Sequence, residues 1–172
     1  DIDAERVAIS PDDHERLAEF AEGWEIDLTV VGPEGPLCDG IADTFDERGL
    51  PIFGPRKQAA RLEGSKSFAK QLMSDAGVPT ADYDVFDRLE PALDHVDSVA
   101  HPVAIKADGL AGGKGVVLSD DRQTSRETLV DYMEDERFGE ASARVVIEEC
   151  LVGEEASFIV VTDGESVVPL TS

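Results

Sequence analysis

The sequence contains no asparagine, little cysteine and no long apolar run. Without asparagine it offers no acceptor for N-glycosylation. Its two cysteines, Cys38 and Cys150, lie far apart and match no metal-ligand spacing, so we expect reduced thiols in a cytoplasmic protein. No apolar stretch approaches the ~20 residues that cross a bilayer, and no signal peptide pattern is present, so we expect no membrane partner.

Positive charge is also scarce, with 15 lysines and arginines against 38 acidic residues and a net charge of -23. Binding to nucleic acid requires a basic face, so we expect no nucleic-acid partner. The acids are spread along the whole chain, whereas an acidic docking surface predicts clustering. Concentrated salt would screen their mutual repulsion, because the Debye length falls to ~3 Å at 1 M. This favours a protein adapted to a salty cytoplasm.

The chain has 172 residues, 41% of them apolar, which is enough for one good core or two small ones. After a helical pattern from Pro11 to Ala21, the first part reads as strand, helix, strand over residues 27–33, 37–48 and 51–55. This order is typical of one βαβ unit of a parallel sheet.

The second part begins with helical stretches over 58–62 and 66–76, the latter capped by Ser65 and stopped by Gly77. We expect this helix to bury Phe68, Ala69, Leu72 and Met73. The remaining elements are a helix over 124–134, a hairpin around Asp163-Gly164, and strands over 101–106, 116–119, 144–149, 158–162 and 167–170. The fold class is therefore α/β followed by α+β.

A glycine-rich segment over residues 103–117 (V-A-I-K-A-D-G-L-A-G-G-K-G-V-V) is the most informative for chemistry. An apolar strand ends near Lys106, and a turn with four glycines and Lys114 follows. Glycines let the backbone approach a ligand and aim its N–H groups at an anion. The segment is neither a P-loop nor a dinucleotide fingerprint. A hairpin with a flexible turn and two solvated lysines is the alternative.

Two further patterns also indicate binding of an anionic nucleotide. Lys66 lies in the first turn of a helix, where its charge opposes the macrodipole unless an anion binds there. The segment Val145–Phe158 places the acid pairs Glu148-Glu149 and Glu154-Glu155 after a strand, and carboxylates can accept hydrogen bonds from a nucleotide's ribose. A solvated lysine and a charged loop are the alternatives.

Together these segments resemble the ATP-grasp superfamily and, within it, the phosphoribosylamine–glycine ligase family. The likeness covers residues 27–40, 53–70, 106–117 and 145–170 in order, and the turn G-P-E-G-P-L and the helix start L-E-G-S-K-S-F-A-K distinguish this family from related carboxylases. It implies ATP-dependent joining of glycine to 5-phosphoribosylamine in purine biosynthesis. It also implies a monomer that uses ATP and Mg²⁺ or Mn²⁺.

The resemblance also implies residue roles. Lys66 and Lys106 would contact the ATP phosphates, with Lys106 and Lys114 as the catalytic lysines. Glu148 would accept from the adenine amino group, Glu149 and Leu151 would use their backbone at a hinge, and Glu155 would hold the ribose. The phosphate loop would consist of Gly112, Gly113, Lys114 and Gly115, and the substrate turn of Glu34, Gly35 and Pro36.

The expected organisation is an incomplete chain. Residues 1–57 would end a parallel-sheet substrate domain, 58–82 would begin the ATP-grasp domain, 83–151 would form its lid, and 152–172 would start its second subdomain. The family's metal ligands would follow Ser172, so we expect no metal ligand and no activity from this chain alone. The open alternatives are another ATP-grasp ligase or carboxylase, a non-catalytic nucleotide-binding module, and a plain acidic α/β domain.

The net charge of -23 predicts salt-dependent folding. We expect the far-UV helical signal to fall when KCl is dialysed away and to return when KCl is restored. Circular dichroism in concentrated KCl and in dilute buffer measures this. A full helical signal in dilute buffer would exclude salt adaptation.

Overall fold

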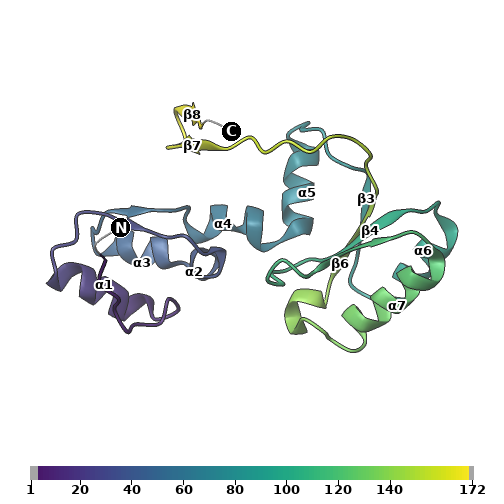
Figure 1. The fold of residues 1–172 in the computed structure, drawn as a ribbon, viewed down its shortest axis with the longest axis horizontal. Coiled ribbons are helices and arrows are strands. Elements are labelled where there is room, and N and C mark those ends of the chain that lie inside the picture. Colours follow the sequence, from purple (N-terminus) through teal and green to yellow (C-terminus); the bar gives the residue numbers. More distant parts are fainter. Residues whose placement is uncertain (1–3, 171–172) are drawn as a thin grey trace.

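The protein was analysed as a computed structural model that describes residues 4–170. The ends at which we expected an incomplete chain, Asp1 and Ser172, lie outside these residues. Figure 1 shows two lobes joined by helices α4 (Lys57–Gly64) and α5 (Lys66–Asp75). The segment after the second lobe passes back over α5 toward the first lobe and ends in a hairpin.

The N-terminal lobe contains the predicted parallel strand pair. Strands β1 (Thr29–Val30) and β2 (Ile52–Phe53) pair in parallel, with Thr29 opposite Ile52. Helix α1 (His14–Gly23) packs with the helices between the strands around a small core of Ala18, Ala21, Ile41 and Phe45. The expected βαβ arrangement is confirmed.

The single helix expected over 37–48 was wrong, because the chain forms two helices there. Helix α2 (Glu34–Asp39) ends at Gly40, whose φ of 103° is a left-handed conformation that favours glycine, and α3 (Ile41–Glu47) begins directly afterwards. The predicted turn at Glu34–Leu37 is the start of α2. Pro36 fits there because the first helical turn needs no N–H from it.

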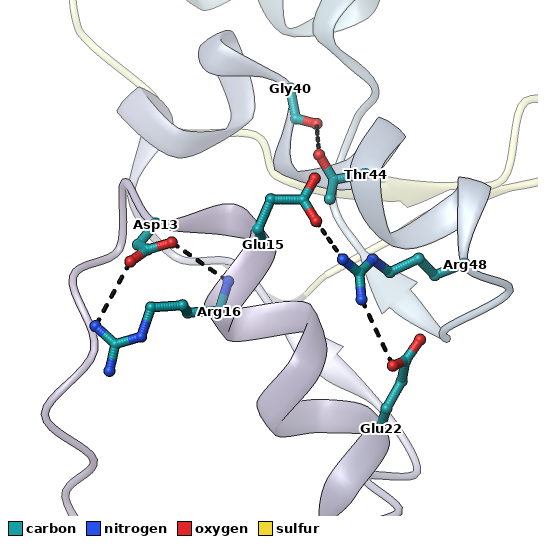
Figure 2. A network of polar contacts seen from close by, with 7 residues as sticks. All are labelled: Asp13, Glu15, Arg16, Glu22, Gly40, Thr44 and Arg48. Carbon is teal, nitrogen blue, oxygen red and sulfur yellow. Dashed lines mark hydrogen bonds and ion pairs between the residues drawn. The ribbon is translucent and has the colours of Figure 1, made fainter.

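Arg48 joins α1 to the end of α3. Its guanidinium pairs with Glu15 and lies 3.5 Å from Glu22, both on α1 (Figure 2). The hydrogen bond that Arg48 donates to Glu15 and the negative charge of the nearby acids raise the pKa of Arg48. These ion pairs are partly exposed, so we assign the packing of this lobe mainly to its apolar core.

The second lobe is a four-stranded antiparallel sheet in the order β3-β6-β4-β5. Three of its elements, β3, α6 and η1, were not predicted. The strands are β3 (Tyr83–Phe86), β4 (Val103–Ala107), β5 (Val116–Ser119) and β6 (Val145–Glu149). The helices are α6 (Leu89–Ser98), α7 (Arg122–Met133) and the 3₁₀ turn η1 (Gly139–Ser142).

The two faces of this sheet differ. Side chains alternate along a strand, so Val103, Ile105 and Ala107 share one face, which packs on α6 and α7 in the main core. Ala104 and Lys106 share the other face with Val146 and Glu148 of β6, as the antiparallel register requires. Helix α5 lies on the side away from α6 and α7 (Figure 1).

Helix α5 begins as predicted but buries a different side chain. The Ser65 hydroxyl accepts from the Phe68 N–H at 3.3 Å, which confirms the cap. Leu72 is 43% exposed, and the residue that α5 buries is Lys70, with 7% exposure. The prediction of a wholly apolar buried face was therefore wrong.

Strands β7 (Val160–Thr162) and β8 (Val167–Pro169) confirm the predicted hairpin. Asp163 fixes its turn by accepting from the N–H groups of Glu165 and Ser166. The side chains of residues 151–170 are all exposed. No helix of residues 4–170 is long and apolar enough to span a membrane.

Candidate functional site

A buried carboxylate on the open sheet face is the centre of the site. Glu148 of β6 is 5% exposed, and its Oε2 lies 2.8 Å from Lys106 Nζ of β4. The same oxygen lies 3.0 Å from Lys70 Nζ of α5. A buried charge is tolerated only when it is paired, and here one carboxylate has two cations.

Lys70 is the site residue that the sequence analysis missed. Besides Glu148, its ammonium donates to Thr80 Oγ1 at 2.7 Å and to the Ala81 carbonyl at 3.4 Å. The available signal was its spacing from Lys66, since residues four apart lie on one helix face. Two hydrogen bonds and one ion pair therefore engage this ammonium, which explains how a lysine can occupy a core position.

The other oxygen of Glu148, Oε1, is buried and has no hydrogen-bond partner among the described residues. A buried polar atom without a partner is costly, so an unpaired acceptor is typical of a ligand site. Exposed apolar side chains lie on the same face of the sheet. Val116 and Leu118 of β5 face the same side, opposite Lys106 and Ala104, and are 47% and 64% exposed.

Lys66 holds the glycine-rich turn rather than pointing into solvent. Its Nζ donates to the Gly109 carbonyl at 3.2 Å, and its backbone N–H donates to the Asp108 carbonyl at 3.0 Å. Burial lowers the pKa of Lys66, and the negative charge of Asp108 partly opposes this. An anion nearby would further favour the charged form of Lys66.

The N-terminus of α5 is already occupied by a protein carboxylate. Asp108 accepts from the Ser67 N–H at 2.6 Å and from the Ser65 hydroxyl at 3.1 Å. The expectation that the helix dipole at Lys66 needs an external anion was wrong, because Asp108 already occupies this position. The side chain of Asp108 supplies the negative charge that this helix end favours.

Two glycines of the turn are required by packing. A Cβ on Gly109 would lie 2.8 Å from the Cα of Ala141, and one on Gly115 would lie 2.6 Å from the Cβ of Ala111. Gly112 and Gly113, which we predicted to bind phosphate, have φ values of 56° and 74° and are exposed.

Lys114 extends from this turn without a fixed partner. It is exposed, and within residues 4–170 its Nζ makes no hydrogen bond or ion pair. The structure therefore pairs Lys106 with Glu148 and bonds Lys66 to the backbone just after β4, while Lys114 remains free to turn toward a ligand.

The remaining predicted residues are not part of this cluster. Glu149 is exposed, and its carboxylate accepts from the Asp82 N–H at 3.1 Å. Leu151 and Glu155 lie in the exposed segment after β6, where neither the Leu151 N–H nor the Glu155 carboxylate is bonded to another described residue. Glu34, Gly35 and Pro36 lie on α2 in the N-terminal lobe, and Pro36 is buried.

A cavity of about 790 Å³ lies beside this cluster, between the ends of α5 and α6. Glu148 and Glu149 line it together with residues 77–84, but Lys66, Lys106 and the glycine-rich turn do not. The cavity is thus adjacent to the charged cluster and does not contain its cations. The sheet face with Val116 and Leu118 is where apolar surface and cations meet.

A metal site is not visible among the described residues. No group of three or more His, Cys, Asp or Glu side chains lies close enough to hold an ion within residues 4–170. The ammonium groups of Lys70 and Lys106 and the unpaired Oε1 of Glu148 suit an anionic ligand that also carries a hydrogen-bond donor.

Two sequence profiles together match almost the whole chain. The profile described as "Phosphoribosylglycinamide synthetase, N domain" matches residues 2–63. The profile described as "Phosphoribosylglycinamide synthetase, ATP-grasp (A) domain" matches residues 64–172.

Curated relatives agree with these profiles. The phosphoribosylamine–glycine ligase of Allochromatium vinosum is 55% identical over 168 residues, which cover 98% of this chain and 39% of the relative. The corresponding ligase of Haemophilus influenzae is 49% identical with the same coverage. The chain thus spans about two fifths of the length of these relatives.

Solved structures are similar as well. The crystal structure of the phosphoribosylamine–glycine ligase of Thermotoga maritima matches 69% of this chain and 30% of its own, with a TM-score of 0.65 and 39% identity. A biotin carboxylase of Campylobacter jejuni matches 81% of this chain and 32% of its own, with a TM-score of 0.67 and 22% identity. The second likeness concerns the fold alone.

The Asp108 contacts predict a measurable loss of stability. We expect Asp108→Ala to lower the free energy of unfolding by about 1–3 kcal/mol, because two donors at the start of α5 lose their partner. Chemical unfolding in concentrated KCl measures this. Asp108→Asn keeps one acceptor oxygen and should lose less.

The matched control is Asp94→Ala, which removes an exposed aspartate from α6 and should change stability by less than about 0.5 kcal/mol. Equal unfolding midpoints for Asp108→Ala and Asp94→Ala would contradict the proposed anchoring of α5 by Asp108.

Proposed function

The chain belongs to the phosphoribosylglycinamide synthetase family, and from this membership we propose that it forms part of an ATP-dependent phosphoribosylamine–glycine ligase. The reaction joins glycine to 5-phosphoribosylamine and gives glycinamide ribonucleotide, ADP and phosphate in purine biosynthesis. The observation that carries the proposal is the convergence of Lys70 and Lys106 on buried Glu148, beside exposed apolar strand residues.

We place the adenine against the open face of β4, β5 and β6. Val116 and Leu118 give it an apolar surface, and the free Oε1 of Glu148 can accept from its exocyclic amino group. Nucleotide sites are mostly apolar and contain a few oriented polar groups, as this face does. A base with a carbonyl in place of the amino group would bring two acceptors together and bind less well.

The polyphosphate would extend along Lys106 toward Lys66 and the glycine-rich turn. Lys106 is the last residue but one of β4, and the turn that follows contains Gly109, whose carbonyl accepts from Lys66 Nζ. We assign phosphate contacts to these two lysines and to Gly112, Gly113, Lys114 and Gly115. The backbone N–H groups of such a turn and nearby ammonium groups stabilise the negative charge of a transferring phosphoryl group.

The remaining assignments complete the nucleotide and substrate contacts. The backbone of Glu149 and Leu151 would meet the adenine at a hinge, and Glu155 would bind the ribose when the exposed segment closes. Glu34 and Gly35, on the surface of α2, would face the phosphoribosylamine. Because Pro36 is buried, we assign it to orienting α2 rather than to direct contact.

The chemistry requires positioning rather than a protein nucleophile. An oxygen of the glycine carboxylate attacks the γ-phosphorus, and the bond to ADP breaks. The amine of phosphoribosylamine then attacks the acyl carbon of glycyl phosphate, releases phosphate and loses a proton. Lys106 and Lys114 would neutralise the transferring group, while the turn excludes water from the acyl phosphate.

ATP would be used with Mg²⁺ or Mn²⁺, which neutralises phosphate charge when bound. Residues 4–170 offer no cluster of three metal ligands, so we assign the metal ligands to no described residue and derive no step through the ion. We further propose a cytoplasmic, salt-adapted monomer. Its domains would divide between residues 57 and 58, 82 and 83, and 151 and 152.

The proposal is tested in the full-length protein in concentrated KCl with magnesium and ATP. ADP release should require both glycine and phosphoribosylamine. Lys106→Met should lower kcat/KM by about 100-fold or more, because a cation on the transferring phosphoryl group is lost. The control Lys57→Met removes the same charge from α4, where Nζ lies 3.4 Å from the Asp39 carbonyl, and should retain activity.

Other results of this experiment would support a different function. ADP release with a different acceptor in place of the two substrates would indicate another ATP-grasp ligase or carboxylase. ATP binding without any release would indicate a non-catalytic nucleotide-binding module. No ATP binding by the folded protein would reject the nucleotide site itself.

A further inference from the structure

Two lysines share one oxygen of one carboxylate, and their surroundings are unequal. Both ammonium groups lie within 3.0 Å of Glu148 Oε2. The side chain of Lys70 is 9% exposed, whereas that of Lys106 is 26% exposed. One of these two cations is therefore accessible to a ligand, and the other is enclosed by protein.

Lys70 is fixed by contacts that do not involve Glu148. Thr80 Oγ1 and the Ala81 carbonyl, in the segment between α5 and β3, both accept from its ammonium. The Tyr83 ring lies with its centroid 5.5 Å from the same nitrogen. By contrast, Glu148 is the one hydrogen-bond partner of Lys106 Nζ among the described residues.

The difference in exposure and in partners between Lys70 and Lys106 affects how the site can bind an anion. A polyphosphate must draw Lys106 at least partly away from Glu148. If Lys106 were the only cation, that movement would leave a buried carboxylate without a partner, which is strongly unfavourable. With Lys70 in place, Glu148 keeps one cation throughout, so the movement of Lys106 costs less.

We propose that Lys70 is a positioning residue, the permanent counter-ion of Glu148, which releases Lys106 to bind the phosphates of the nucleotide. The proposal rests on the proposed ATP site and goes beyond it, because it assigns a role to a residue that does not touch the nucleotide. Lys70 also keeps Oε2 paired, which leaves the unpaired Oε1 to accept a hydrogen bond from the base.

A double-mutant cycle on ATP affinity tests this role in the full-length protein in concentrated KCl. We expect Lys70→Met to raise the Kd for ATP about tenfold or more, because Glu148 then retains Lys106. In the Glu148→Gln background the same change should alter Kd by less than about threefold, since a neutral side chain does not hold Lys106 as an ion pair. A purely structural role for Lys70 would weaken ATP binding equally in both backgrounds.

Two further variants keep the test decisive if Lys70→Met folds poorly. Thr80→Val removes one acceptor of the Lys70 ammonium and keeps the shape of the side chain. It should raise the Kd for ATP in the same direction by about threefold, and only when Glu148 is present. Lys57→Met is the charge-matched control and should leave Kd unchanged.

The outcomes separate the inference from the proposed function. If Lys106→Met and Glu148→Gln leave ATP affinity unchanged, the ATP site itself is misplaced. If Lys106→Met weakens binding while Lys70→Met and Thr80→Val do not, the nucleotide site stands and the role of Lys70 is rejected. Equal effects of Lys70→Met with and without Glu148 would also reject it.

Discussion

The buried charge of Glu148 is the constraint on which this arrangement depends. A carboxylate with 5% exposure must have a cation close by, and the fold supplies two from different elements. This explains why the helix α5 buries a lysine where its pattern suggests only apolar residues. It also fixes α5, the segment leading to β3 and the central strands β4 and β6 to one another, because all of them contribute to the same group of polar contacts.

A second group of polar contacts lies just after the C-terminal end of β4, two residues beyond Lys106. Asp108 accepts from the start of α5, Lys66 donates to Gly109, and Gly109 packs so closely on Ala141 that no side chain fits between them. The glycine-rich turn is therefore held at its base and free at its tip, where Gly112 and Gly113 are exposed. A turn with a fixed base and a free tip is suited to closing over a ligand without disturbing the strands that carry Lys106.

The sequence predicts the local features well, and contacts between distant segments poorly. The Ser65 cap, the Val116–Ser119 strand and the hairpin at Asp163-Gly164 follow from short-range signals and are confirmed. The meeting of Lys70 with Glu148 depends on the order β3-β6-β4-β5, which joins segments that lie far apart in the chain. No spacing rule reveals that order. The division of one expected helix at Gly40 was missed because a left-handed glycine is compatible with either a stop or a restart.

The chain as a whole is strongly negative, whereas the candidate site contains several lysines. Burial of these lysines explains how the two can coexist. A net charge of -23 repels an anionic nucleotide at long range, and concentrated salt removes most of that repulsion. Salt would equally weaken a site made of exposed lysines. Of the five lysines, however, Lys66, Lys70 and Lys106 are partly or fully buried within the candidate site. Buried charges are screened less than exposed ones, so their attraction for phosphate persists at the salt concentration that suppresses the general repulsion. An acidic surface and a small, enclosed cationic site are therefore compatible when each buried lysine is paired within the protein, as Lys70 and Lys106 are with Glu148.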